Sequence, residues 1–169
     1  MEAPDCDKIF GDKRRAIMTR AERAKAYFEE GYNCAQAVTL AFAEEMGLEK
    51  EAAAKMASSF GGGLGRMREV CGAVSGMSLA AGALFGYADP KAKEEKADHY
   101  ALIQKLAGEF REQAGSVICR ELLAGINNDT NPVPEERTSS YYKKRPCGEL
   151  VALAAGILET EINKRAEKN

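Results

Sequence analysis

The hydrophobic and polar positions of the chain follow a helical period along most of its length. Apolar residues recur at intervals of three and four, as in Ala37, Val38, Ala41 and Phe42, which is the spacing of a helix that buries one face. No segment shows the strict alternation typical of a half-buried strand. The pattern predicts helices over 20–30, 34–46, 50–59, 70–85, 91–113, a short segment after Ser116, and from Pro146 onward. We therefore expect an all-α fold, a compact bundle of about five to seven helices.

Residues that favour helix ends stand at the ends of these segments. Thr19, with Glu22 three positions later, has the pattern of a capping box, and Asn33 is a candidate N-cap for the next helix. Asp89 and Pro90 form a start signal for the longest helix. We expect the buried stripe of that helix at Tyr100, Ile103, Leu106 and Phe110.

Two segments allow more than one interpretation. Residues 70–88 carry no charge, but their many small residues favour a buried helix over a membrane span. Gly72 and Gly76 share one helix face, which fits tight packing within the chain or a homodimer. The polar connection 125–145 is unusually long, which is typical of functional or mobile loops. Its basic end, 141–145, is either a plain loop or a docking patch for an acidic partner.

Composition indicates a soluble, weakly acidic protein. The chain has 169 residues, of which 45% are hydrophobic and 30% charged, and its formal net charge is −2. This balance provides no basic field for nucleic acid or for an anionic membrane. No apolar signal segment follows the acidic first residues, so we expect a cytoplasmic protein. We expect a loosely structured leader over 1–18 and a single helical four-cysteine domain over 19–169.

Four of the five cysteines stand at predicted helix starts: Cys34, Cys71, Cys119 and Cys147. The partial positive charge of a helix N-terminus lowers the pKa of a thiol and favours the thiolate, the form that attacks disulfides and binds metals. No two of the four are close in sequence, so there is no CxxC, haem-attachment or zinc-finger spacing, and a shared site must come from folding. We expect these four residues to be the catalytic or metal-binding residues. Cysteines that act only as small buried hydrophobic residues are the alternative.

Glycines and arginines surround Cys71 in the sequence. Gly61, Gly62, Gly63 and Gly72 allow positive φ and a close approach of the backbone, and we expect them to contribute to binding a cofactor. They resemble a phosphate-binding loop only loosely, because no Gly-Lys-Ser/Thr follows. Three arginines lie near cysteines and either stabilise a thiolate or are ordinary surface residues: Arg66, Arg68 and Arg120.

These motifs together resemble the C_GCAxxG_C_C family, described as redox-active proteins and named for four cysteines. The resemblance covers roughly residues 20–160 and rests on Tyr-Asn-Cys-Ala-Gln-Ala-Val at 32–38, Phe-Gly-Gly-Gly-Leu-Gly at 60–65, Cys-Gly-Ala-Val-Ser-Gly at 71–76, Gly-Ser-Val-Ile-Cys-Arg-Glu-Leu-Leu at 115–123 and Cys-Gly-Glu-Leu-Val at 147–151. The signature here reads Cys-Gly-Ala where the family name has Gly-Cys-Ala. The resemblance implies that Cys34, Cys71, Cys119 and Cys147 are the family cysteines, and Cys6 lies outside it.

Three functions are compatible with four such cysteines. The resemblance implies an iron–sulfur cluster that transfers electrons to a redox partner protein, and four thiolates are what a cluster needs. Pairs of thiols that cycle between dithiol and disulfide without metal are the first alternative. A structural or sensory zinc site with four cysteine ligands is the second, although zinc sites usually take two ligands from one short knuckle. A copper or arsenical sensor is a further soft-metal possibility. Whether the protein is an enzyme is left open.

Overall fold

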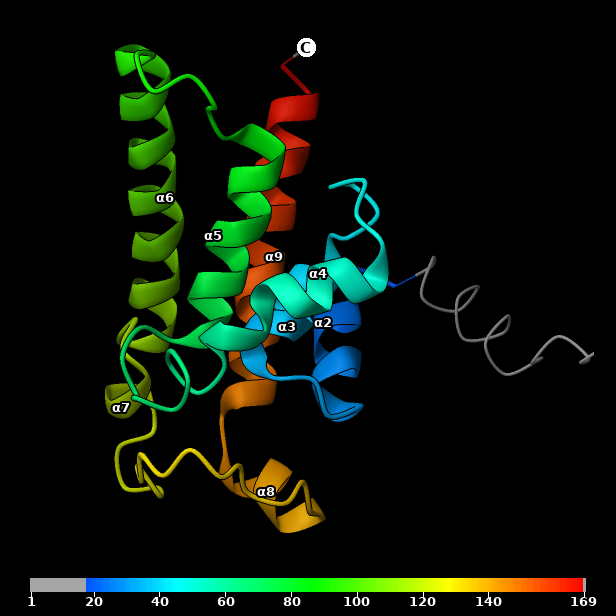
Figure 1. The fold of residues 1–169 in the computed structure, drawn as a ribbon, viewed down its shortest axis with the longest axis vertical. Helices are drawn as coiled ribbons and strands as arrows, with labels where there is room; N and C mark the ends of the chain where they lie inside the picture. The colour runs from blue at the N-terminus through cyan, green and yellow to red at the C-terminus, as the bar shows by residue number, and fades with distance from the viewer. Residues whose placement is uncertain (1–17, 169) are drawn as a thin grey trace, which may run out of the picture.

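The computed structural model describes residues 18–168. These residues form eight α-helices and one 3-10 turn, and their only β-type pairing is an isolated bridge (Figure 1). The all-α prediction is therefore confirmed. The elements are α2 (Arg20–Glu29), α3 (Cys34–Ala41), α4 (Lys50–Ala57), η1 (Ser58–Phe60), α5 (Gly72–Phe85), α6 (Lys93–Ala114), α7 (Cys119–Leu122), α8 (Ser139–Lys144) and α9 (Cys147–Ala166). Cys6 and the expected leader, except its last residue, lie outside the described residues.

Two of the predicted caps, Thr19 and Asn33, form as expected. The Thr19 hydroxyl accepts a hydrogen bond from the Glu22 N–H (3.2 Å), and the Glu22 carboxylate accepts one from the Thr19 N–H (2.8 Å). Asn33 and Gln36 make the same reciprocal pair at the start of α3, at 2.9 and 3.1 Å. Each pair satisfies backbone donors that a helix start leaves without partners. The position of Cys34, directly after Asn33, is thus fixed by local sequence.

Several helix ends differ from the sequence prediction: α4 ends at Ala57 and not at residue 59, and α5 begins at Gly72 and not at residue 70. α3 stops at Ala41, and turns instead of helix continue to residue 47. α6 begins at Lys93 and not at residue 91, because the Asp89 carboxylate accepts a hydrogen bond from the Lys91 N–H (2.8 Å) within a turn. The connection 125–145 also contains a short helix, α8, which the sequence pattern did not predict.

The buried face of α6 is rotated from the predicted stripe. Tyr100 is 53% exposed, so its prediction as a buried residue was wrong. Its hydroxyl instead accepts a hydrogen bond from the Tyr87 hydroxyl at 3.3 Å, on the outside of the bundle. The residues of α6 that are buried lie four positions apart, along one line that faces the core: Leu102, Leu106 and Phe110.

The core lies between α2, α3, α5 and α9, with α6 packed along α5 and α9. α3 and α5 approach closely, because a Cβ added to Gly76 would lie only 2.6 Å from the Ala35 carbonyl oxygen and 3.0 Å from the Val38 Cβ. Gly76 is therefore used for packing within the chain. No helix within 18–168 has the length and apolar character that a membrane crossing requires, so 70–88 is not a span.

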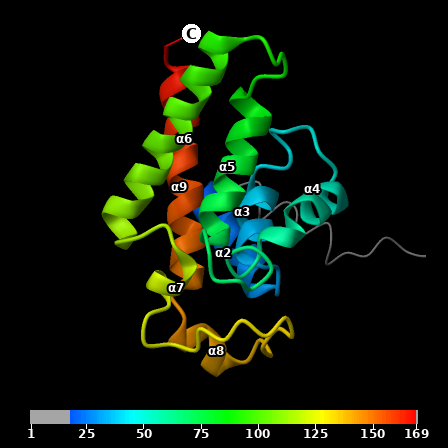
Figure 2. The same ribbon diagram turned by 60° about the vertical axis from the view of Figure 1, so that its left-hand side comes forward.

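One end of the bundle collects several helix starts. The starts of α5 and α9 lie there together with α7, and the connection that carries α8 closes this end (Figures 1 and 2). The backbone N–H of Cys71 donates to the Val117 carbonyl (2.8 Å), and the N–H of Cys119 donates to the Glu69 carbonyl (2.6 Å), on either side of the bridge between Val70 and Ile118. This bridge fastens the segment before α5 to the segment before α7.

Candidate functional site: a four-cysteine cavity

All four predicted cysteines stand at helix starts. Cys34, Cys119 and Cys147 are the first residues of α3, α7 and α9, and Cys71 is the N-cap of α5. All four are free thiols. The structure therefore places these residues where the sequence pattern predicted.

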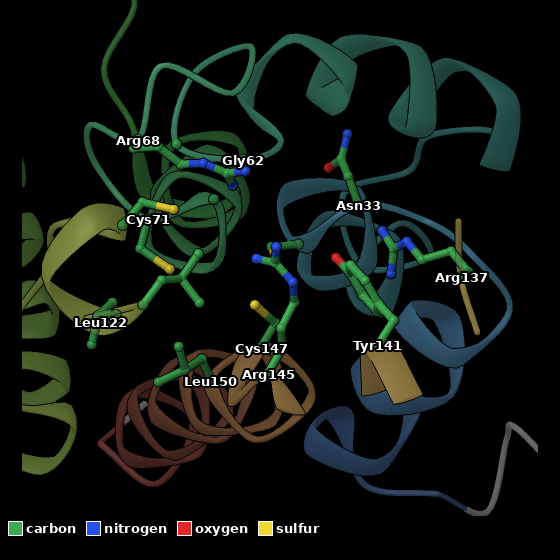
Figure 3. A pocket seen from close by; sticks show the side chains of 15 residues that line it. Asn33, Gly62, Arg68, Cys71, Leu122, Arg137, Tyr141, Arg145, Cys147 and Leu150 are labelled. Atoms are coloured by element: carbon green, nitrogen blue, oxygen red, sulfur yellow. The ribbon is translucent and has the colours of Figure 1, made fainter. Parts of the chain in front are cut away.

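Folding brings the four cysteines to one cavity of about 50 Å³ at the closed end of the bundle (Figure 3). Cys71, Cys119 and Cys147 are 4%, 7% and 8% exposed, and Cys34 is half-buried. A cavity of this size has room for about three or four water molecules, or for one small group. Its lining also includes the side chains Arg68, Arg137, Tyr141 and Arg145.

Cys34 and Cys147 form one wall of the cavity, and each shifts the pKa of the other. A hydrogen bond between their thiols raises the pKa of Cys34 well above its ordinary value, and burial raises it further. The same hydrogen bond lowers the pKa of Cys147 to about 7, against the effect of burial. Arg145 and Arg137 lower it further. The pair is therefore a thiol donor beside a sulfur that ionises near neutral pH.

Cys71 and Cys119 form the other wall, on either side of the bridge described above. Burial raises the pKa of Cys71 to about 12, although the N–H groups of Ala73 and Val74 at the start of α5 act in the opposite direction. Burial also raises the pKa of Cys119, and the Arg68 side chain, as a hydrogen-bond donor, opposes this. Both residues remain thiols at neutral pH.

These pKa values correct one sequence prediction. Helix starts were expected to favour thiolates at all four positions, but this holds only at Cys147. At Cys71 and Cys119, burial disfavours the thiolate more strongly than the partial charge of the helix terminus favours it. At Cys34 the hydrogen bond to Cys147 is the largest cause, followed by burial, so three of the four pKa values rise. At Cys147 the hydrogen bond from the Cys34 thiol and the nearby guanidinium groups of Arg145 and Arg137 outweigh burial, and the pKa falls.

The arginines at the cavity come from two different segments. Arg68 lies in the glycine-rich segment, is 4% exposed and lines the cavity with the cysteines, so it is not an ordinary surface residue. Arg120 is about half exposed and pairs with Glu69 (2.8 Å) outside the cavity. Arg66 also lies outside, with its Nε donating to the Asn131 carbonyl (2.6 Å).

Sequence reasoning missed Arg137 and Arg145. Arg145 is 8% exposed and pairs with Glu135, and the Arg137 guanidinium lies 4.6 Å from the centre of the Phe28 ring. Arg145 stands two residues before Cys147, so the reasoning that selected Arg68 by its closeness to a cysteine in sequence would have found it. No such signal exists for Arg137, which folding brings from the middle of the connection.

The predicted glycines make room for the cysteines. A Cβ on Gly63, where φ is +70°, would lie 2.6 Å from the Cys119 Cβ, and a Cβ on Gly72 would lie 3.1 Å from the Cys34 Cβ. Gly62 also lines the cavity, whereas Gly61 does not, and a Cβ added to Gly61 would lie 2.5 Å from the Asn33 amide nitrogen. These contacts support close packing around the thiols; whether the four glycines bind a cofactor stays a prediction.

The donors in the cavity are right in kind for an iron–sulfur cluster or for zinc, since both bind thiolates. Within residues 18–168, however, no three side chains of the His, Cys, Asp and Glu types are grouped so that they could hold a metal ion. As arranged, the residues do not fit a metal centre.

Comparisons with known proteins yield one finding. No curated protein and no solved structure matches the chain. Residues 32–161 match a family described as "Putative redox-active protein (C_GCAxxG_C_C)", a match that includes all four cysteines of the cavity. Because the match covers most of the 169 residues, the chain belongs to the C_GCAxxG_C_C family of redox-active proteins.

Proposed function

We propose that this protein is a thiol–disulfide redox protein in which Cys34 and Cys147 form the active pair. The observation that carries the proposal is that both thiols line the same cavity, where each is the largest single cause of the other's pKa shift. Thiols within hydrogen-bonding distance need only a small side-chain movement to reach the S–S bond length of about 2.05 Å. The pKa of Cys147, near 7, gives this pair a nucleophile at neutral pH.

The reaction is a two-electron exchange with a disulfide of a partner, RSSR. The Cys147 thiolate attacks one sulfur of RSSR, an S–S bond forms, and RS⁻ leaves with the electron pair of the broken bond. Cys34 then gives its proton to the first RS⁻ and attacks the Cys147 sulfur, which releases the second RS⁻ and leaves a Cys34–Cys147 disulfide. The second RS⁻ takes from water the proton that Cys147 lost on ionising. The pair is oxidised by two electrons, RSSR is reduced to two RSH, and the reverse sequence reduces the pair again.

The order of attack follows from the charges in the cavity. A negative charge on Cys147 contributes to the raised pKa of each of the other three cysteines, so one thiolate at a time is favoured. Once Cys147 is in a mixed disulfide it carries no charge and no longer accepts the proton of Cys34. The largest cause of the raised Cys34 pKa is then gone, and Arg137 favours the thiolate that completes the exchange.

An iron–sulfur cluster is the second candidate function, because all four family cysteines line the same cavity. Cys34, Cys71, Cys119 and Cys147 would be its ligands, and the cluster would supply one-electron transfer. A four-cysteine zinc site would use the same residues. Both require a rearrangement of the thiols, since the described residues are not grouped for a metal ion. We also propose, from the sequence, that the protein acts with a redox partner protein and is located in the cytoplasm.

Anaerobic purification separates these functions. We expect a colourless protein without stoichiometric iron, labile sulfide or zinc, in which one equivalent of a small disulfide such as hydroxyethyl disulfide removes two titratable thiols. A brown protein with iron and sulfide would replace the proposal with the cluster, and one zinc per chain would replace it with the zinc site. A metal-free protein whose thiols resist this oxidant would also refute the proposed exchange.

A further inference from the structure

Arg68 holds an unsatisfied donor at the cavity. The residue is 4% exposed, and its Nε donates to the Asp129 carbonyl at 3.1 Å. Its Nη2 is buried and has no hydrogen-bond partner among the described residues. The side chain extends from the glycine-rich segment toward the middle of the cavity (Figure 3). A buried guanidinium N–H without an acceptor destabilises the folded protein, so a ligand that supplies a hydrogen-bond acceptor at this position would be stabilising.

Arg137 holds a second unsatisfied donor on the opposite side. Its Nη2 donates to the Tyr32 carbonyl at 3.3 Å, and its guanidinium lies 4.6 and 4.8 Å from the ring centres of Phe28 and Tyr141. Its Nη1 is buried and has no partner within the described part of the chain. The rings fix the plane of the guanidinium, and the Tyr141 hydroxyl points into the same cavity (Figure 3).

The charges at the cavity do not balance. Arg145 is paired with the Glu135 carboxylate, but no carboxylate of residues 18–168 forms an ion pair with Arg68 or Arg137. Even when Cys147 is ionised, one positive charge remains without compensation. Buried charges are stabilised when they are paired and hydrogen-bonded, and an anion with several oxygen atoms supplies both.

We propose that the cavity binds a small oxyanion, held by the free guanidinium nitrogens of Arg68 and Arg137 next to the Cys34–Cys147 pair. The ligand class follows from geometry: two guanidinium groups favour oxygen acceptors, and about 50 Å³ accommodates a small ion but not a peptide. The proposal concerns binding and assigns the anion no chemical step. It therefore goes beyond the disulfide exchange and does not depend on it.

The test uses sulfate, which thiols do not reduce, and the reduced, metal-free full chain. The melting temperature is measured in sulfate and in chloride at equal ionic strength. For the wild type we expect a rise that saturates with sulfate, by about 3–5 °C at ten times Kd. Arg68→Gln should lose the saturable rise. Arg120→Gln, on an exposed arginine outside the cavity, should keep it.

A rise that is equal in the wild type, Arg68→Gln and Arg137→Gln, or that never saturates, would overturn the proposal, since sulfate also stabilises proteins in general by exclusion from their surface. Should Arg68→Gln fail to fold, Arg68→Lys keeps the charge and lacks the planar fork, and we expect about tenfold weaker sulfate binding. Unchanged affinity in Arg68→Lys together with Arg137→Gln would likewise overturn it. No oxidant is present, so the outcome is independent of whether the proposed disulfide forms.

Discussion

The two walls of the cavity carry the same residue type at the same kind of position, yet their thiols behave differently. Cys34 and Cys147 begin α3 and α9 and shift each other's pKa, which for Cys147 lies near 7. Cys71 and Cys119 flank a backbone bridge at the starts of α5 and α7, and burial holds both as thiols. The helix terminus is common to both walls, so it does not decide reactivity.

The pKa values of the two walls differ because the groups around each sulfur differ. Cys147 receives a hydrogen bond from a second thiol and lies near Arg145 and Arg137, so its negative charge is stabilised from several directions. Cys71 is buried, and the two backbone N–H groups near it do not offset the effect of burial on its pKa. Reactivity at this site thus depends on tertiary contacts and only weakly on helix position.

The largest contrast is expected from removing one cysteine on each wall. Cys147→Ser should slow disulfide exchange with a small disulfide by at least about 100-fold, because the nucleophile is lost. Cys119→Ser should change the rate by no more than about threefold, since exchange needs only the other wall. Stopped-flow measurement of RSH release gives both rates. Equal losses in the two variants would mean that the walls act as one unit.

The next effect concerns the space that glycine leaves beside Cys119. Gly63→Ala forces a Cβ to within 2.6 Å of the Cys119 Cβ at a φ of +70°, and we expect a loss of about 2–3 kcal/mol in unfolding free energy. Gly108→Ala is the matched control in α6, where nothing lies within 4 Å, and should be neutral or stabilising by up to about 1 kcal/mol. Urea unfolding measures both. Similar stabilities would show that the wall is not tightly packed.

A smaller effect is expected in the pH dependence of alkylation. The rate at which iodoacetamide modifies Cys147 should rise with a midpoint near pH 7. Cys34→Ala, which removes the donor, should move this midpoint more than Arg145→Gln does, because the hydrogen bond from Cys34 is the larger cause of the lowered pKa. Peptide mass spectrometry follows each site separately. A midpoint near pH 9 in the wild type would remove the distinction between the walls.

The smallest effect is a pair of opposite pH dependences in the stability of the reduced protein. Cys147 has a lowered pKa when folded, so its contribution is present above pH 9 and is lost as the pH falls from about 9 to 7. Cys71 has a pKa raised to about 12, so its contribution is present below pH 9 and is lost as the pH rises toward 12. Urea midpoints across this range should pass through a maximum near pH 9.

Two variants show which cysteine causes the rise and which causes the fall of the urea midpoint with pH. Cys147→Ser should remove the rise between pH 7 and 9, and Cys71→Ser should weaken the fall above pH 9. A curve that keeps its shape in both variants would attribute it to other groups.

Local sequence carried much of the fold and of the site. The helix starts at Thr19 and Asn33 could be predicted because a capping residue acts over only three residues. The four cysteines were selected because they lie at predicted helix starts of this kind. Arg137 was not predicted because the connection 125–145 has no hydrophobic periodicity from which its position in the fold could be inferred. Likewise, the pKa of a thiol depends on burial and on partners from other helices, which sequence spacing does not encode.

The pairing of Cys34 with Cys147 is the central claim, and mapping the first disulfide tests it most directly. The reduced, metal-free protein is treated with less than one equivalent of hydroxyethyl disulfide, quenched at low pH, digested and analysed by mass spectrometry. The account predicts that the peptides containing Cys34 and Cys147 are linked, while Cys71 and Cys119 remain thiols. A first disulfide between Cys71 and Cys119, or a mixture without preference, would contradict it.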